Sequence, residues 1–373
     1  MKIAMIGHKR IPSREGGVEI VVEELATRMA KQGHQVVAYN RKGKHVSDDS
    51  YSIANINEYK GVHIANVPTI DKKGLNALIY SFFATIKAIF GKYDVIHYHA
   101  EGPCGMLWIP KLFGIRTVAT IHGLDWQRAK WGGFATKYLK FGEKVAAKWA
   151  NEVIVLSKNM QKYFWEEYGR ETRYIPNGVT IPVSRQISIL KERYGMEQED
   201  YILFLARIVP EKGVHYLIEA FKQIDTDKKL VIAGGASHTS EYYGEIAELA
   251  KTDDRIIMTG FVQDEILEEL YSNCCLYVLP SDVEGMPISL LEAMSYGKSC
   301  LVSDIPENLE LVNGHARSFR HGDVEDLKLQ LEQCLQECTG YCEDNVEYLR
   351  NNFNWNTIVE QTIELYKKEQ YKV

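Results

Sequence analysis

The chain has little of what indicates disulfides or metal clusters. Its 373 residues include seven cysteines, an odd number, and none of them stands in a C-x-x-C pair. This usage is typical of free thiols in a reducing cytosol. Cys334, Cys338 and Cys342 are spaced four residues apart, but Leu327 and Leu331 belong to the same helical stripe. We therefore expect these thiols to pack in a core rather than to bind a metal.

Long hydrophobic runs are also absent. No stretch reaches the roughly 20 apolar residues that a membrane-spanning helix requires, and the longest, from Leu75 to Phe90, contains Lys87. The opening stretch MKIAMIG has a strand pattern, and the apolar segment of a signal peptide does not follow it. The G-x-G-x-x-G spacing of a dinucleotide-binding turn is missing, which disfavours NAD. We expect a cytoplasmic protein.

Acidic and basic residues are divided unevenly along the chain. The whole chain has 44 Lys and Arg against 50 Asp and Glu, a net charge of −6. Residues 1–176 hold 26 basic and 16 acidic residues, which gives +10, and the remainder holds 18 and 34, which gives −16. We infer that the two halves meet different partners.

Short β-branched runs alternate with helical patterns through both halves. Such interleaving predicts βαβ units and parallel sheets. Because the chain is also long for a single core, we predict an α/β fold with two doubly wound, Rossmann-like domains. Each should bind ligands at the carboxyl ends of its strands. The expected strands are 2–7, 35–39, 62–66, 94–99, 116–121 and 152–156, then 201–206, 230–233, 256–259, 274–279 and 299–303.

Turn residues suggest the domain boundaries. The stretch IPNGVTIPVSRQ places Pro176, Gly178 and Pro182 between the two series of strands. We therefore expect a first domain at 1–176, a linker at 177–200 and a second domain at 201–354. A final helix at about 355–373 follows an Asn-rich break, and we expect it to pack back on the first domain.

Two glycines stand at the tip of the first strand, in IGHKRIPSREGGVEIVVEEL. Gly16 and Gly17 have two explanations that this stretch does not separate. Either the turn needs a positive φ, which glycine permits, or backbone N–H groups at the helix start hold an anion. Arg10 and Arg14 favour an anion, whereas Glu19 in the first helical turn opposes one.

The second domain holds the densest set of candidate functional residues. Arg207 follows a predicted strand, and Lys212 stands at a helix start. Further along, LPSDVEGMPISLLEAM has a loop with Glu284 and a helix opened by Pro287, which suits the first helical position. Arg207 and Lys212 supply charge for a diphosphate, and Glu292 is placed to accept the hydroxyls of a ribose. An anion site suited to phosphate is expected at the first N–H groups of this helix, those of Ile288, Ser289 and Leu290.

These residues resemble the signature of a known family. Arg207, Lys212 and the Glu284-x7-Glu292 pattern in EGMPISLLEAM are similar to the motif of the retaining family-four glycosyltransferases, which have the GT-B fold. IPNGV at 175–179, GF at 260–261 and the N-terminal glycine pair stand in the family's usual order, so the resemblance covers nearly the whole chain. It implies transfer of a sugar from a nucleotide-diphosphate donor with the anomeric configuration kept.

The resemblance also implies a role for each matching residue. Arg207 and Lys212 bind the donor diphosphate, Glu292 binds the ribose, and Glu284 holds sugar hydroxyls. The backbone of Gly16 and Gly17 approaches the donor phosphates, and 260–262 borders the base. The implied donor-binding set is Gly16, Gly17, Arg207, Lys212, Gly260, Phe261, Val262, Glu284, Gly285, Met286, Pro287, Ile288, Ser289, Leu290 and Glu292.

Histidines follow or occupy two predicted strands of the first domain. His122 in ATIHGLDW stands at the carboxyl edge of the sheet, and in similar enzymes the matching histidine contacts the donor sugar. The resemblance therefore adds His122 to Arg207, Lys212 and Glu284 as catalytic residues, while a structural histidine at a strand end is the alternative. His97 and His99 have the spacing of a metal pair on a strand. We expect no metal and no cofactor, because the helix dipole and cations replace a metal in this fold.

A finer resemblance concerns the acceptor. The N-terminal stretch and GLDWQRAKWGGFATKYLKFGEKVA are similar to bacterial capsule and exopolysaccharide transferases, including rhamnosyltransferases. This implies a peripheral enzyme on the inner face of the cell membrane that acts on a polyprenyl-diphosphate-linked glycan; no nucleic-acid module is visible. Four lysines are predicted on one helical face, and an apolar stripe lies next to them. We expect this basic face either to bind an anionic membrane and the acceptor, or to be a solvated face beside a stripe that packs in the core. The lysines are Lys137, Lys140, Lys144 and Lys148, and the stripe is Phe134, Tyr138, Phe141, Val145 and Trp149.

Two other classes remain open at this point. A nucleotide-sugar epimerase of the same fold releases an altered sugar without an acceptor, so product analysis separates it from a transferase. An inactive partner subunit of a glycosyltransferase complex is the other alternative, although the intact motif residues argue against it. The donor also stays open between L-rhamnose from dTDP and glucose, galactose or an N-acetylhexosamine from UDP.

Overall fold

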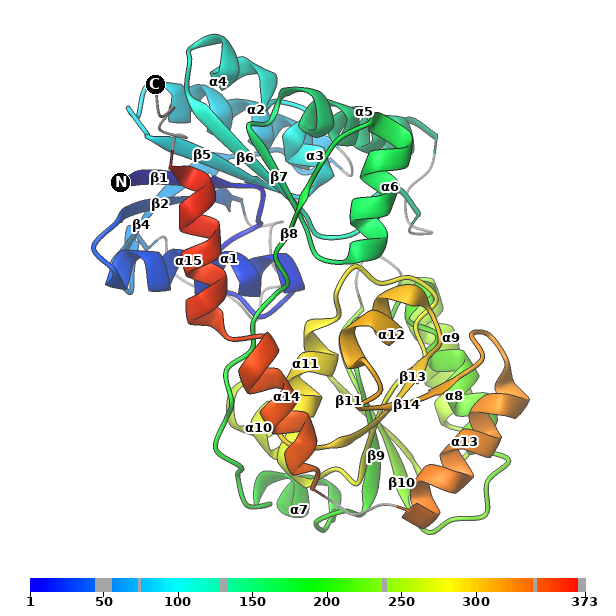
Figure 1. Ribbon diagram of the computed structural model, residues 1–373. Coiled ribbons are helices and arrows are strands. Elements are labelled where there is room, and N and C mark those ends of the chain that lie inside the picture. The colour runs from blue at the N-terminus through cyan, green and yellow to red at the C-terminus, as the bar shows by residue number, and fades with distance from the viewer. Residues whose placement is uncertain (44–55, 73–74, 128–132, 237–239, 338–340, 368–373) are drawn as a thin grey trace. The chain divides into compact units, whose positions relative to one another are not determined.

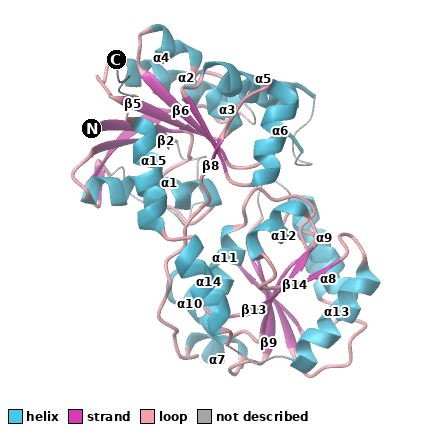
Figure 2. Cartoon of the chain, viewed as in Figure 1, coloured by secondary structure: helices cyan, strands magenta, loops and turns pink. Residues whose placement is uncertain are grey.

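The chain is described by a computed structural model that defines residues 1–43, 56–72, 75–127, 133–236, 240–337 and 341–367 (Figure 1). It divides into two compact units. The first comprises Met1–Gln127, the stretch up to Gly178 and the C-terminal helix from Trp355, and the second comprises Val179–Asn354. Each unit is built on one largely parallel sheet with helices packed against it (Figure 2). The predicted α/β class with two parallel-sheet domains is therefore confirmed.

The first unit contains an eight-stranded sheet. Its strand order is β3-β4-β2-β1-β5-β6-β7-β8, and β3 pairs antiparallel with β4 while the other neighbours are parallel. The sequence predicts six of these strands and misses β3 and β8, because two residues cannot display an alternating pattern. The strands are β1 (Lys2–Ile6), β2 (Gln35–Lys42), β3 (Glu58–Tyr59), β4 (Val62–Pro68), β5 (Val95–His99), β6 (Arg116–Ile121), β7 (Glu152–Val155) and β8 (Arg173–Tyr174).

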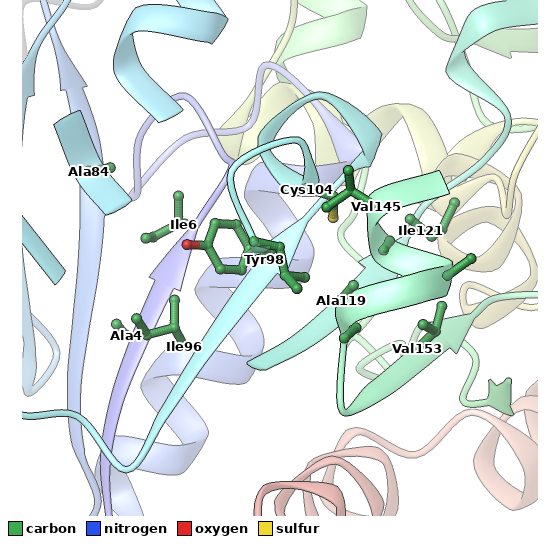
Figure 3. Close-up of a cluster of buried hydrophobic side chains, with 14 of the residues drawn as sticks. Ala4, Ile6, Ala84, Ile96, Tyr98, Cys104, Ala119, Ile121, Val145 and Val153 are labelled. Atoms are coloured by element: carbon green, nitrogen blue, oxygen red, sulfur yellow. The ribbon is translucent and has the colours of Figure 1, made fainter. Parts of the chain in front are cut away.

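Helices cover both faces of this sheet. Helices α1 (Gly17–Lys31) and α15 (Trp355–Tyr366) pack together on one face. The other face carries α2 (Leu75–Ile89), α3 (Glu101–Cys104), α4 (Trp108–Leu112), α5 (Gly133–Trp149) and α6 (Lys158–Tyr168). Figure 3 shows the core beneath this second group, where Ile6, Tyr98 and Ile121 of the strands meet Val145 of α5. Alternate strand residues therefore serve opposite faces, as the two-residue period of a strand requires.

The C-terminal helix completes the first unit. The Nε of Arg116 in β6 donates a hydrogen bond to the carbonyl oxygen of Leu365 at 2.9 Å. The hydroxyl of Tyr366 lies 2.6 Å from the Nδ1 of His97 in β5. Residues more than 200 positions apart in the chain are thus joined in one core.

The second unit contains a six-stranded parallel sheet in the order β11-β10-β9-β12-β13-β14. Five strands fall where the sequence predicts them, and the three-residue β14 is the one missed. The strands are β9 (Tyr201–Leu205), β10 (Lys229–Ala233), β11 (Ile256–Gly260), β12 (Leu276–Leu279), β13 (Ser299–Ser303) and β14 (Arg317–Phe319). The helices are α7 (Ile189–Tyr194), α8 (Val214–Phe221), α9 (Ser240–Ala250), α10 (Asp264–Asn273), α11 (Ile288–Ser295), α12 (Pro306–Val312), α13 (Val324–Glu337) and α14 (Glu343–Asn352).

The segment 177–200, expected to be a linker, is folded into the two units. Its first two residues belong to the first unit, and the rest belongs to the second. Val179 forms a β-bridge with Asn354. At the start of α7, the buried carboxylate of Glu269 accepts hydrogen bonds from three successive N–H groups, those of Ser188, Ile189 and Leu190. The sequence pattern could not reveal this, because Glu269 lies on α10, far along the chain.

The expected packing of the thiols concerns two described residues. Cys334 on α13 packs against the core of the second unit beside the buried Leu327 and Leu331. Cys342 is the residue directly before α14, it is partly buried, and its side chain makes no capping hydrogen bond. Cys338 lies outside the described residues. Within the described part of the chain, every helix is too short or too polar to span a bilayer.

Candidate functional site

The motif residues of the second unit gather at the carboxyl edge of its sheet. Arg207 follows β9, Gly260 ends β11, and Glu284 lies in the loop after β12. Strand β9 has β10 on one side and β12 on the other, so the strand order reverses here. Open parallel sheets bind their ligands at such a switch point.

Gly213 brings two segments of this edge into contact. Its φ is +65°, and a Cβ at this position would lie 2.0 Å from the carbonyl oxygen of Pro280. The N–H of Asp282 donates to the carbonyl oxygen of Glu211 at 2.9 Å, directly beside this approach. A glycine is therefore required where the turn before α8 meets the loop after β12.

This contact places Lys212 against Glu284. The Nζ of Lys212 lies 2.5 Å from the Oε1 of Glu284, and the two side chains are only 14% and 6% exposed. From the family resemblance, Lys212 was assigned to the donor diphosphate and Glu284 to the sugar hydroxyls, and their pairing was not predicted. Because both are largely buried, removal of either one deprives the other charge of this partner, and breaking a buried pair in this way typically costs about 3–5 kcal/mol.

The N-terminus of α11 faces the same edge. Pro287 is the residue that precedes the first turn, with φ −73° and ψ 109°, and not the first helical residue as predicted from its ring. The first intrahelical bond runs from Leu291 N–H to Pro287 oxygen at 3.3 Å. The N–H groups of Ile288, Ser289 and Leu290 precede that bond, and Pro287, the residue before the helix, provides no side-chain cap for them. The positive end of the helix dipole is therefore directed as an anion site requires.

Two buried tyrosines hold α11 in place. The hydroxyl of Tyr271 donates to the Oε2 of Glu292 at 3.0 Å, and that of Tyr277 lies 2.8 Å from the Oγ of Ser289. Burial raises the pKa of both phenols well above the ordinary value, so they remain neutral donors. The sequence analysis missed both, because LYSNCCLYVL reads as an ordinary core segment.

The end of β11 exposes an aromatic ring. Gly260 has φ +71°, and its carbonyl oxygen accepts a hydrogen bond from the N–H of Gly234 at 2.8 Å. The following side chain, Phe261, is 44% exposed. In contrast, Gly285 and Met286 in the loop after β12 are buried. An exposed ring beside a glycine turn can border a flat base.

In the first unit, Gly7 lies close to the backbone of a neighbouring strand, and Gly16 has an ordinary extended conformation. Gly16 is extended, with φ −161°, so the explanation from a positive φ is wrong for it. Gly7 has φ +132°, and a Cβ there would lie 2.1 Å from the carbonyl oxygen of His99. The carboxylate of Glu19 accepts the N–H of Lys9 at 2.8 Å, and its other oxygen lies near Gly16. The first turn of α1 is thus partly covered by its own acid.

Three histidines line the carboxyl edge of this sheet. His122 follows β6, and its Nε2 lies 3.1 Å from the Nδ1 of His99 at the end of β5. His97 is buried, and its two ring nitrogens contact the hydroxyls of Tyr366 and Thr120 at 2.6 Å and 2.7 Å. Metal ligation by His97 is therefore disfavoured, because both of its nitrogens are occupied. Among the described residues, no group of three or more ligating side chains has the arrangement of a metal site.

A buried carboxylate anchors the segment that follows His122. Glu143 on α5 accepts hydrogen bonds from the Nε1 of Trp126 at 3.1 Å, from Tyr163 at 2.7 Å and from Tyr168 at 2.5 Å. Burial raises the pKa of both tyrosines, and the Glu143 carboxylate raises it further. This cluster was not expected from the sequence, because its members come from three separate elements.

The basic face of α5 is solvent-exposed, and so are some of the aromatic residues expected in the core. Tyr138 and Val145 pack inward, with the Tyr138 hydroxyl donating to the Gly102 oxygen at 2.9 Å. Phe134 and Phe141 are 76% and 49% exposed. The interpretation of a core stripe is therefore wrong for these two rings and for Trp149, which is also exposed. The exposed cations are Lys137, Lys140, Lys144 and Lys148.

Comparison with known proteins connects these features to a family. Residues 15–181 match the family described as Glycosyltransferase Family 4, and residues 187–352 match the family described as Glycosyl transferases group 1. An uncharacterised glycosyltransferase of Methanocaldococcus jannaschii is 24% identical, over 98% of each chain. Sucrose-phosphate synthase from Thermosynechococcus elongatus has a TM-score of 0.81 at 22% identity, and Anabaena HepE in complex with UDP and glucose has 0.79 at 20%, each covering 98% of both chains. Because the two matched families span both units and the solved structures share their fold, the chain is a glycosyltransferase with the GT-B fold.

Proposed function

We propose that this glycosyltransferase moves a sugar from a nucleoside-diphosphate donor to a lipid-linked glycan, with retention of the anomeric configuration, in bacterial surface polysaccharide synthesis. The observation that carries the donor half is the convergence of Arg207, Lys212 and the α11 N-terminus at one sheet edge. Cations and a helix dipole together suit a diphosphate. The bound UDP of Anabaena HepE supports a uridine nucleotide as the first donor class to test.

Each remaining motif residue takes one part of the donor. Glu292, held by Tyr271, accepts the ribose hydroxyls. Phe261 borders the base, and Glu284 binds sugar hydroxyls while it stays paired to Lys212. Gly16 and Gly17 contact the donor phosphates through their backbone.

The proposed chemistry needs positioning and charge more than a protein nucleophile. The bond from the anomeric carbon to the phosphate oxygen breaks, a bond to the acceptor oxygen forms on the same face, and the acceptor proton passes to the leaving phosphate. Arg207, Lys212 and the α11 N–H groups stabilise the negative charge that develops on that phosphate. We expect activity to survive EDTA for the same reason.

A nucleotide screen tests the donor half. Thermal unfolding should shift upward with UDP or dTDP and their sugars, including dTDP-L-rhamnose, because a ligand that binds the folded state stabilises it. Arg207→Ala and Lys212→Ala should lower turnover roughly a hundredfold or more, whereas Lys251→Ala, at an exposed lysine of the same unit, should not. Near-normal turnover in both motif variants would remove the diphosphate assignment.

Product analysis separates the competing activities. A transferase yields an extended glycan and a nucleoside diphosphate, whereas an epimerase yields an altered nucleotide sugar or free sugar without any acceptor. A chain that binds no nucleotide sugar would fit an inactive partner subunit.

The acceptor half rests on one face of the first unit. Helix α4 packs against both α2 and α5, and Figure 1 shows all three on the same side of the sheet. Apolar side chains that are exposed on these helices or at their ends are Phe82, Phe83, Phe90, Trp108, Leu112, Phe113, Phe134 and Phe141. Large exposed apolar side chains on neighbouring helices are typical of a surface that binds a partner.

Charge on the same helices favours an anionic bilayer as the partner. The four exposed lysines of α5 contribute about 1 kcal/mol each near such a surface, and neighbouring aromatic rings can enter the headgroup region. A lipid-linked acceptor does not leave the bilayer, so the enzyme must come to it.

Liposome sedimentation tests this surface. Binding should require anionic lipid and weaken at high salt through screening. It should fall when the four lysines of α5 become glutamate, and it should fall separately in Phe134→Ser/Phe141→Ser. Equal binding to neutral liposomes, or no binding, would overturn membrane docking without affecting the donor assignment.

A further inference from the structure

A ladder of three histidine rings links the C-terminal helix to His122. The rings of His97 and His99 are tilted by 33° with their centroids 4.1 Å apart, and those of His99 and His122 are tilted by 30° with their centroids 5.3 Å apart. Strands β5 and β6, which are neighbours in the sheet, place them side by side. The ladder occupies the carboxyl edge of the first sheet, where α/β folds bind ligands.

His97 provides a fixed, neutral base for the ladder. Its nitrogens contact Tyr366 and Thr120, whose hydroxyls can each donate or accept. Burial, with His122 nearby, lowers the pKa of His97 to about 3. The ring therefore stays uncharged and cannot rotate without breaking two hydrogen bonds.

The hydrogen bonds of His99 decide which ring nitrogens of His99 and His122 carry protons. It is fully buried, and its Nδ1 contacts the Nε2 of His122. Its own Nε2 is buried and has no hydrogen-bond partner among the described residues. Burial lowers the pKa of His99 well below the ordinary value, and the neighbouring His97, His122 and His8 lower it further, so this ring is also neutral.

A neutral imidazole carries one proton, which leaves two possible tautomers for His99. With the proton on Nε2, a buried N–H would have no acceptor, and orphaned N–H groups are rarer than orphaned acceptors. With the proton on Nδ1, His99 donates to His122, and only a bare nitrogen stays unpaired. The second tautomer is therefore favoured.

We infer that His99 is a positioning residue for His122: it donates from its Nδ1 to the Nε2 of His122, and this hydrogen bond leaves the ring proton of His122 on Nδ1. In that form the lone pair of the His122 Nε2 accepts the hydrogen bond from His99, and Nδ1 already carries a proton, so neither nitrogen is available to take up another proton. His122 then acts as a hydrogen-bond donor to a sugar or phosphate oxygen and not as a general base. This role rests on the proposed transfer reaction, whereas the tautomer itself does not.

Nuclear magnetic resonance reads the tautomer without any substrate. In the full chain labelled with 15N-histidine, long-range proton–nitrogen correlations at mildly alkaline pH distinguish a protonated from a bare ring nitrogen. The His122 signals are assigned by their loss in His122→Gln. We expect a protonated Nδ1 and a bare Nε2 in the wild type. A proton on Nε2 of His122 would overturn the inference, and this measurement needs no further variant.

Variants at His99 test its control over His122. His99→Phe should let both tautomers of His122 appear, while His99→Asn, whose amide N–H stands near the position of Nδ1, should keep one. His63→Phe, at an exposed histidine of β4, is the matched control and should change nothing. A single unchanged tautomer in His99→Phe would contradict the inference.

Turnover of the donor found by the nucleotide screen completes the test. His99→Phe should lower kcat about tenfold or more, as for other partners that orient a functional histidine, while UDP affinity stays the same and His99→Asn regains most of the rate. Equal losses in the two variants would overturn the positioning role. If the wild type turns over no donor, the proposed function fails, and the tautomer measurement still decides the inference.

Discussion

Replacing Gly213 with alanine tests how the fold holds Lys212 against Glu284. A Cβ at Gly213 would lie 2.0 Å from the Pro280 oxygen, although real Cβ atoms essentially never come within 3.0 Å of such a neighbour. Gly195 in the same unit is a matched control. Its φ is +59°, almost the same as the +65° of Gly213, but no atom lies within 4 Å of its Cβ position. The pair therefore separates the cost of the backbone conformation from the cost of the contact.

The two costs differ enough to measure. A left-handed conformation costs a residue with a Cβ roughly 1–2 kcal/mol, and the loss of chain freedom in the unfolded state returns about 0.4–1 kcal/mol. Gly195→Ala should therefore lower the free energy of unfolding by about 1 kcal/mol. Overpacking adds about 1–3 kcal/mol at Gly213, because a backbone carbonyl cannot rotate away, so Gly213→Ala should lose about 3 kcal/mol in total.

Scanning calorimetry with and without UDP is the assay. A domain of this size shifts its Tm by roughly 2–4 °C per kcal/mol, so Gly213→Ala should melt several degrees below Gly195→Ala. It should also lose the upward shift given by UDP, because the turn that carries Lys212, which is assigned to the diphosphate, must move. Equal melting temperatures in the two variants, with UDP stabilisation kept in both, would refute the role given to Gly213.

Two further predictions concern the first unit. Lowering the pH should destabilise it, because burial lowers the pKa of His97 to about 3 and of His8 to about 4, whereas the ordinary value is 6.5. Between the lowered pKa and 6.5 the unfolded chain therefore binds more protons than the folded chain, so the free energy of unfolding falls with falling pH by up to about 1.4 kcal/mol per pH unit for each histidine. Urea titrations at neutral and acid pH measure this dependence. If the free energy of unfolding of His97→Gln depends on pH as that of the wild type does, this reasoning is contradicted. Glu143→Gln should lower the free energy of unfolding by roughly 2–3 kcal/mol, since one amide oxygen cannot accept from all three donors, and it should alter the fluorescence of Trp126. The control is the same substitution at the exposed Glu166. Equal effects of the two substitutions would show that the buried cluster contributes nothing.

The sequence predicts best what depends on short-range pattern. Eleven strands of the two sheets were expected from alternating apolar runs, and all are present. Arg207 and Glu284 were predicted at the edge of one sheet because each follows a strand. Parallel strands end together, so position along a strand is enough to place such residues.

What could not be predicted depends on contacts between distant segments. The pairing of Lys212 with Glu284 is set by the approach of Gly213 to Pro280, which no local pattern encodes. The contact of Glu269 with the start of α7, a helix far earlier in the chain, could not be predicted for the same reason. The contact of Gly7 with the backbone of His99 was not expected either, because a sequence shows where a glycine stands but not which glycine meets a neighbouring backbone.

The return of α15 to the first sheet has a consequence for biosynthesis. Because Trp355–Tyr366 belongs to the first unit, the second unit is interposed in it and emerges whole from the ribosome before the first is complete. Domains form as units during translation, so the nascent chain should hold a finished second unit beside a first one that still lacks a helix. Until Leu365 and Tyr366 arrive, Arg116 and His97 have no partners in that helix, and the exposed sheet face is a natural target for chaperones.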